Sequence, residues 1–323
     1  MTLSDLPDHG HEPVLPDETL HYLGLAPGDT VVDCTLGRGG HSGLIADRIG
    51  RAGTLIALDA DPSNLAYAAQ RLRDAPCTTH LLHRNFAELD EVLTELGLVQ
   101  VDAILADFGV STNQLLDSER GLSFSSPDAP LDMRLDPNLP TTAADIVART
   151  AEKKLADLIF GLADERGSRR IARKIIETRQ KLPIQTVGQL AELVRSVLPR
   201  PKPVRGRKSP AIDPATRTFM ALRMAVNREL DVLTDWLGLV PRLLKSGGRV
   251  VAISFHSGED RLVKNAFRDA RQQGTFELLT KKPVTAGDDE LQRNPRARSA
   301  KLRAARRTNE SLDQRPYPPL SPP

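Results

Sequence analysis

A glycine-rich turn between two acids is the part of this sequence with the clearest potential for chemistry. Gly37, Gly39 and Gly40 follow Asp33, and Asp59 ends the next apolar run. Glycines let the backbone approach a ligand closely, and an acid placed like Asp59 accepts hydrogen bonds from both hydroxyls of a ribose. Asp33, just before the turn, would repel a pyrophosphate but suits the ammonium and sulfonium charges of S-adenosylmethionine. The pattern predicts a site for this cofactor, and the alternative is a tight turn between solvated acids.

Asp107 ends the apolar run 101–107 and is the predicted catalytic residue. In the methylation of an amine, the nitrogen must attack in line with the sulfonium carbon, and a carboxylate can orient the amine and take its proton. An exocyclic amine of the cytosine type is a poor nucleophile until its lone pair is freed from the ring, so an acceptor beside it helps the reaction. The alternative is an aspartate that caps the following turn.

These acids need a scaffold that brings the ends of strands together. Short apolar runs end near residues 34, 59, 85 and 107, and helical patterns alternate with them. Alternation of this kind predicts an α/β fold with a parallel sheet covered by helices. Because ligands bind at the carboxyl ends of such strands, the three acids are expected to share one edge of the sheet.

The alternation is interrupted in the middle of the chain. Residues 142–198 carry only helical patterns, residues 199–214 form a basic, proline-rich loop, and a buried strand pattern returns at 249–255. We therefore expect one α/β domain with an insertion. The expected parts are a discontinuous core at 1–115 and 215–310, an all-helical insertion at 116–214 and a disordered tail at 311–323.

The formal net charge of +2 hides two opposite halves. Residues 1–150 hold 9 basic and 23 acidic side chains, whereas residues 151–323 hold 35 and 19. Clustered basic residues release counterions from phosphates, so the second half predicts a polyanionic partner. Without a signal peptide or an apolar run of about 18 residues, we expect a cytoplasmic protein and no membrane contact. Cys34 and Cys77 have neither disulfide nor zinc spacing.

Nine segments of the chain resemble one known family, in the same order along the sequence. They are HEPVL (11–15), DCTLGRGGHS (33–42), ALDADP (57–62), DFGVS (107–111), RGLSF (120–124), PLDMRLD (130–136), TFMALRMAVNREL (218–230), ISFHSGEDR (253–261) and NPRARSAKLRAA (294–305). They are similar to the bacterial 16S rRNA (cytosine-N4)-methyltransferases of the RsmH or MraW type. The resemblance implies a class I S-adenosylmethionine-dependent methyltransferase, Rossmann-like, with an inserted helical domain. The implied substrate is a cytidine in the decoding region of 16S rRNA, within the 30S subunit.

The resemblance also implies which residues contact the cofactor. They are Gly39, Gly40, His41, Asp59, Phe86, Asp107 and Gln114. Phe86 would form an apolar wall for the face of the adenine. The chain departs from the family pattern at Asn113, where a proline is common, at Met220, where glutamine is usual, and at Gly258, where leucine is usual.

The substrate side of the site is expected around the last clear strand. Ser254, His256 and Ser257 are predicted to border the target-base pocket, although a structural role is an open alternative. We expect no metal at His256, Glu259 and Asp260, because methyl transfer from a sulfonium needs no Lewis acid.

RNA-backbone contacts are predicted in three basic segments, 166–181, 200–208 and 293–307, and the N-terminal segment at 11–13 is predicted to fold over the cofactor. The alternative for that terminus is a disordered tail. The candidate RNA-binding residues are Arg205, Arg207, Lys208, Arg296 and Arg298.

Two other functions remain open at this level. One is a ribosome-assembly factor that occupies the 30S subunit through its basic half and uses the cofactor only for stability. The other is a nicotinamide-dependent oxidoreductase, because Gly37, Gly39 and Gly43 resemble a dinucleotide fingerprint. Asp33 and the lack of a clear acid for hydride transfer disfavour the oxidoreductase. A homodimer is compatible with either reading.

Overall fold

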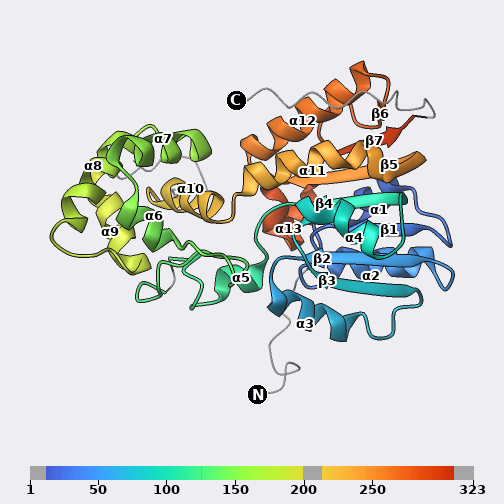
Figure 1. Ribbon diagram of the computed structural model, residues 1–323, viewed down its shortest axis with the longest axis horizontal. Coiled ribbons are helices and arrows are strands. Elements are labelled where there is room, and N and C mark those ends of the chain that lie inside the picture. The colour runs from blue at the N-terminus through green and yellow to red at the C-terminus, as the bar shows by residue number, and fades with distance from the viewer. Residues whose placement is uncertain (1–11, 125, 199–212, 309–323) are drawn as a thin grey trace. The chain divides into compact units, whose positions relative to one another are not determined.

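The structure, a computed structural model, describes residues 12–124, 126–198 and 213–308 (Figure 1). The chain divides into two compact units, one made of Met1–Gly109 with Leu230–Pro323 and the other of Val110–Glu229. The expected boundaries of the insertion, 116 and 214, are therefore corrected outward at both ends. No helix in the described ranges is long and apolar enough to cross a membrane.

The first unit holds a seven-stranded sheet of order β3-β2-β1-β4-β5-β7-β6. The strands β1 to β5 pair in parallel, and β7 runs antiparallel to both of its neighbours. The strand order reverses between β1 and β4, which is where open α/β sheets bind their ligands. The strands are β1 (Thr30–Asp33), β2 (Thr54–Asp59), β3 (Thr78–His83), β4 (Val101–Asp107), β5 (Leu244–Ser254), β6 (Phe276–Leu278) and β7 (Lys301–Arg307).

Helices cover both faces of this sheet, because the strands are apolar on both sides and successive side chains point to opposite faces. Val32, Ile104 and Val250 pack in one core with α4, α11 and α12, while Val31 and Val251 pack in another with α1, α2 and α3. This arrangement confirms the expected Rossmann-like class. The helices are α1 (Pro16–Leu23), α2 (Gly40–Ile49), α3 (Pro62–Arg71), α4 (Leu89–Glu95), α11 (Glu229–Leu243), α12 (Ser257–Gln272), α13 (Asp288–Arg293) and the 3₁₀ helices η2 (Phe86–Glu88) and η3 (Pro295–Ser299).

The strand β7 lies in a segment that the sequence presents as a basic arm. Within Lys301–Arg307, Leu302 and Ala304 are buried, and Arg303 pairs with Asp260 at 2.7 Å. The prediction that all of 293–307 contacts RNA is therefore corrected, since its second half is an interior strand of the sheet. Leu302, Ala304 and Ala305 are buried in this strand, and the basic residues around them conceal the strand pattern.

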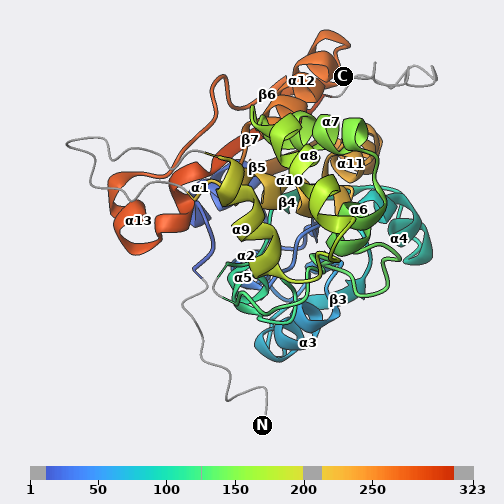
Figure 2. The same cartoon turned by 90° about the vertical axis from the view of Figure 1, so that its left-hand side faces the viewer.

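The second unit is built from helices around an apolar core of its own. α7 packs against both α8 and α10 (Figure 2). Leu155, Ile175, Leu190 and Leu222 bring four of its helices into this core. The helices are α5 (Thr112–Leu116), α6 (Ala143–Arg149), α7 (Glu152–Ala163), α8 (Ser168–Arg179), α9 (Val187–Val197) and α10 (Thr216–Val226).

The helix α10 belongs to the second unit, whereas the sequence predicts that the α/β core resumes at residue 215. Phe219 and Leu222 are buried in the helical core. Arg228 adopts a left-handed backbone with φ 50° and separates α10 from α11, so these are two helices and not one. Periodicity identifies an apolar helix face, but it does not say which of two cores buries that face.

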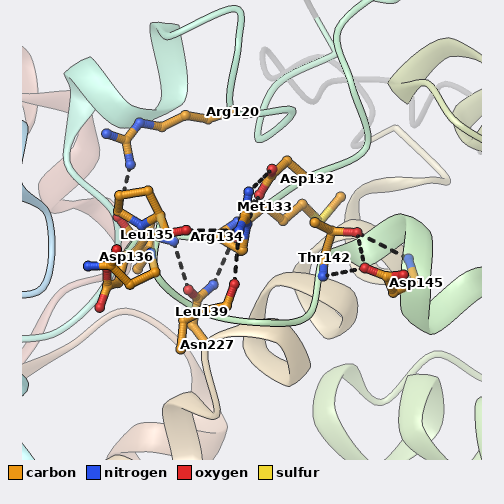
Figure 3. A network of polar contacts seen from close by, with 12 residues as sticks. Arg120, Asp132, Met133, Arg134, Leu135, Asp136, Leu139, Thr142, Asp145 and Asn227 are labelled. Carbon is orange, nitrogen blue, oxygen red and sulfur yellow. Dashed lines mark hydrogen bonds and ion pairs between the residues drawn. The ribbon is translucent and has the colours of Figure 1, made fainter.

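A network of polar contacts fixes the loop that leads into α6 (Figure 3). Arg134 binds both carboxylate oxygens of Asp132 at 2.8 Å and donates to two backbone carbonyls. Asn227 accepts from the Leu135 N–H and donates to the Met133 carbonyl, each at 2.8 Å. Burial alone would raise the pKa of Asp132, but the Arg134 contacts hold that pKa below its usual value. Asn227 thus ties this loop to the end of α10.

Replacing Asn227 with alanine is expected to lower the free energy of unfolding by about 1–3 kcal/mol, since partly buried backbone groups lose their partners. Urea denaturation monitored by circular dichroism measures the change. Asn138→Ala is the matched control, because Asn138 is exposed in the same loop, and it should change stability little. Equal stability of the two variants would contradict a role of Asn227 in holding the loop.

Candidate functional site

Four polar residues end four adjacent strands at one edge of the sheet. In the order β2-β1-β4-β5 these residues are Asp59, Asp33, Asp107 and Ser254. The pairing of Asp107 with Ile253 places Ser254 one residue beyond it on the neighbouring strand. The carboxyl ends of parallel strands thus bring together acids that lie far apart in the sequence.

The glycine turn between β1 and α2 has a conformation that only glycine adopts easily. Gly37 has φ 51° and Gly39 has φ 76°, both in the left-handed region. Asp59 accepts from the Gly37 N–H and the Asp61 N–H, each at 2.8 Å, and from the Asn64 amide at 3.1 Å. Burial raises the pKa of Asp59 to about 6, against the effect of these donors. Asp59 therefore holds the turn in place at the end of the next strand.

Asp33 is buried more deeply than the sequence suggests, with 1 % of its surface exposed. It accepts from the Ser42 hydroxyl at 2.6 Å and from the Thr35 N–H at 3.1 Å. Burial raises its pKa, and the Ser42 hydrogen bond opposes the rise. Asp33 thus ties β1 to the turn and to α2, while its contact with a cofactor ammonium group stays a prediction.

Asp107 and His41 face one another at this edge. His41 Nε2 lies 3.7 Å from Asp107 Oδ2, and the Asp107 N–H donates to the Thr35 hydroxyl at 2.7 Å. Within the described part of the chain, His41 Nε2, Asp107 Oδ1 and Ser254 Oγ are buried and have no hydrogen-bond partner. Buried polar atoms are almost always paired in native proteins, so a group of unpaired ones at one edge suits a polar ligand.

Sequence reasoning passed over Thr35, Ser42 and Asn64. Thr35 joins the ends of β1 and β4, Ser42 anchors Asp33, and Asn64 supports Asp59. A usable signal was present, since each of these residues has a side chain that can bond to a nearby acid and each lies within nine positions of one.

Phe86 begins η2, shortly after β3, and β3 lies beside the strand that carries Asp59. Its ring packs 5.8 Å from that of Phe108 and 6.2 Å from that of Trp236, centroid to centroid. The side chain remains partly exposed. An aromatic surface fixed by two neighbours is compatible with the predicted wall for adenine.

Gln114 lies on α5 in the second unit, and its side chain is 4 % exposed. Its amide oxygen accepts from the Ser111 N–H at 2.9 Å, as part of a capping box. A helix starts here without the proline that the family pattern has at Asn113. The contact of Gln114 with the cofactor stays a prediction.

His256 and Ser257 start α12, directly after β5. His256 is the N-cap residue, and its Nδ1 accepts from the N–H groups of Gly258 at 3.2 Å and Glu259 at 3.4 Å. Glu259 is 3 % exposed and accepts in turn from the N–H groups of Phe255 and His256. The structural role left open for His256 is therefore present, and its contact with substrate is a separate prediction.

The predicted RNA-binding residues are divided between described and undescribed parts of the chain. Arg205, Arg207 and Lys208 lie outside the described residues. Arg296 and Arg298 lie on η3 in the first unit, where both are exposed. η3 thus presents two exposed arginines of the expected basic arm.

Known proteins match this chain along the sequence of both units. The model of the MraW methylase family matches residues 8–308. A protein of Acidobacterium capsulatum named Ribosomal RNA small subunit methyltransferase H is 48 % identical over 301 residues, which cover 91 % of this chain and 97 % of the relative. A protein of the same name from Koribacter versatilis is 48 % identical over 304 residues, which cover 92 % and 94 %. The resemblance seen in the motifs is confirmed: the chain belongs to the MraW methylase family and is an S-adenosylmethionine-dependent methyltransferase.

Proposed function

We propose that this protein methylates the exocyclic N4 of a cytidine in the 16S rRNA of the 30S subunit, in the cytoplasm. The relatives named for the small ribosomal subunit support an rRNA substrate. The observation that carries the choice of an amine is Asp107, whose unpaired Oδ1 lies at the strand end beside the glycine turn. A carboxylate there can accept a hydrogen bond from an amino group and take the proton that the amine loses.

The proposed cofactor site consists of the glycine turn, Asp33, Asp59 and Phe86, which fit the charges, ribose and adenine of S-adenosylmethionine. When bound, the cofactor supplies an electrophilic methyl carbon on a sulfonium. Asp107 would accept a hydrogen bond from an N–H of the target amine and direct the nitrogen lone pair toward that carbon. It would receive the amine proton as the N–C bond forms and the bond between the methyl carbon and sulfur breaks, which leaves the cofactor as a neutral thioether. The Asp107 N–H donates to the Thr35 hydroxyl at 2.7 Å, and this hydrogen bond fixes the backbone position from which the carboxylate extends.

Incubation of 30S particles with the purified protein and labelled S-adenosylmethionine tests the reaction. The expected product after digestion of the RNA to nucleosides is N4-methylcytidine. Label on a ring carbon or a ribose oxygen would contradict the proposed chemistry. If the 30S particles stayed unlabelled after the incubation, the proposed substrate would be wrong. Particles that already carry the modification serve as the negative control.

The helix α8 provides a basic surface suited to RNA phosphates. It buries Ile171 and Ile175, while Arg169, Arg170 and Arg173 are exposed on its other side. Arg173 is 70 % exposed, and its nearest acid, on α7, is 3.9 Å away. Exposed arginines that are not held in close ion pairs are available to replace counterions along a phosphate backbone.

Reversing the charge of Arg169 and Arg173 to glutamate is expected to weaken RNA binding. The slope of log K against log salt should fall by about 1.5, from about 0.7–0.9 for each lost phosphate contact. Binding of a 16S rRNA fragment by filter assay at several salt concentrations measures this slope. Arg48→Glu with Arg51→Glu is the matched control, since both residues are exposed near the end of α2. An equal loss in both pairs would indicate general charge repulsion and not an α8 contact.

A further inference from the structure

A short segment at the beginning of the described chain lies against the glycine turn. We call residues 12–15 the strap. Val14 is 7 % exposed and Leu15 is fully buried, and Leu15 adopts a left-handed backbone with φ 52° where it caps α1. A non-glycine residue in that region is strained and persists only where its surroundings hold it. The strap therefore needs external contacts to keep its conformation.

These contacts come from the other end of the chain, at α13. Glu290 Oε1 accepts from the Leu15 N–H at 2.7 Å, and the Asn294 amide donates to the Glu12 carbonyl at 3.2 Å. Glu290 is 9 % exposed and Asn294 is 8 % exposed. Arg293 adds an ion pair with the Glu12 carboxylate at 3.2 Å. Two nearly buried polar side chains thus hold a backbone about 275 positions away.

The strap in turn covers the first residue of α2. A Cβ atom at Gly40 would lie 3.3 Å from Pro13 Cβ and 3.4 Å from Pro13 Cδ, which is tighter than most Cβ contacts and would require Pro13 to shift by a few tenths of an ångström. Gly37 and Gly39 need to be glycine because of their positive φ, but Gly40 has no such φ. The Pro13 ring therefore packs closely against Gly40, and a larger side chain at position 40 would have to displace it.

We propose that Glu290 and Asn294 are positioning residues of the cofactor site, which act through the strap by seating Pro13 on Gly40. The proposal rests on the proposed function, since it takes the glycine turn as the binding site of S-adenosylmethionine. Loss of the acceptor at Glu290 leaves the buried Leu15 N–H unpaired. The free energy then favours a conformation of the strap in which water solvates this N–H. The start of α2 loses its cover, and the turn is less well organised for the cofactor.

Two substitutions of Glu290 separate positioning from packing. Glu290→Leu keeps a side chain of similar size but removes the acceptor, whereas Glu290→Gln keeps an oxygen at the same place. Burial raises the pKa of Glu290, and its neutral form also accepts through a carbonyl oxygen, so glutamine is a close substitute. In calorimetry with S-adenosylmethionine, we expect about a tenfold loss of affinity for Glu290→Leu and less than about a twofold loss for Glu290→Gln. The KM for the cofactor should rise in parallel, with kcat at saturation unchanged.

A double-mutant cycle tests whether the effect passes through Pro13. Glu290→Leu should weaken binding in the parent but add little in a Pro13→Gly background, since the strap no longer contacts Gly40. Gly40→Ala should also weaken binding, and Pro13→Gly should relieve that defect. Additive effects in both cycles would overturn the proposal.

Asp59→Ala distinguishes failure of this proposal from failure of the proposed function. If Asp59→Ala loses affinity while Glu290→Leu binds as the parent does, the cofactor site stands and the positioning role is wrong. If Asp59→Ala also binds as the parent does, the cofactor does not occupy this edge, and both proposals fall. A fall in kcat for Glu290→Leu without a change in KM would overturn the positioning role as well.

Discussion

Asp107→Asn is expected to lower kcat for methyl transfer by about 10²–10⁴-fold, the usual contribution of a positioned proton acceptor. Asparagine has the same shape but offers a neutral oxygen in place of the unpaired carboxylate Oδ1. The Asp107 N–H still donates to Thr35, so the strand end should keep its place. Single-turnover rates with 30S particles measure the change in the chemical step, and calorimetry should show that S-adenosylmethionine still binds.

The matched control is Asp102→Asn, five positions earlier on the same strand. The Asp102 carboxylate accepts from the Thr30 N–H at 2.9 Å and pairs with Lys245 at 2.7 Å, so its role is structural. We expect a modest loss of stability and a normal kcat for this variant. Near-normal activity of Asp107→Asn would remove Asp107 from the mechanism, and an equal loss in Asp102→Asn would assign the effect to the strand.

The affinity for S-adenosylmethionine is expected to fall as the pH is lowered through about 6, because burial raises the pKa of Asp59 to about 6. In the proposed site, the ionised carboxylate is the form that would accept from both ribose hydroxyls. Binding therefore competes with protonation, and well below this pKa the dissociation constant should rise about tenfold per pH unit. Calorimetry between about pH 5 and pH 8 measures this dependence.

The contribution of Asp59 to the free energy of unfolding depends on pH in the opposite direction from its contribution to cofactor affinity. Its pKa in the folded protein, about 6, lies above its ordinary value of 3.8, so the folded state binds more protons between these pH values. The free energy of unfolding should therefore fall as the pH rises from about 4 to about 6. Asp59→Asn should remove the contribution of this residue to both pH dependences. Cofactor binding should be weaker at neutral pH, and both affinity and the free energy of unfolding should change less with pH. An unchanged pH profile in this variant would exclude Asp59 as the titrating group.

The local chemistry of the site could be predicted from the sequence. The positive φ of Gly37 and Gly39 and the strand ends at Asp33 and Asp59 depend on neighbouring residues, and the pattern of apolar runs contains that information. The alternation of strands and helices likewise predicts a parallel sheet with its ligand site at the carboxyl edge. For the same reason the helical insertion is visible as a stretch without strand patterns.

Other features depend on partners that are distant in the sequence. The helix α10 has an apolar face that either core could bury, and the second unit buries it. The basic residues of β7 conceal its strand pattern. β7 forms a strand because it pairs with β5 and β6, which are distant in the sequence from most of its residues.

The sequence by itself thus determined the turn, its acids and the α/β class, because local geometry and periodicity carry them. Only the tertiary structure decided that Gly40 is matched to Pro13 and that Glu290 holds the strap. Periodicity records that a residue is buried or polar but not which distant group it meets. Hydrogen bonds and close packing between the two ends of the chain are set by the folded backbone, which brings those ends together.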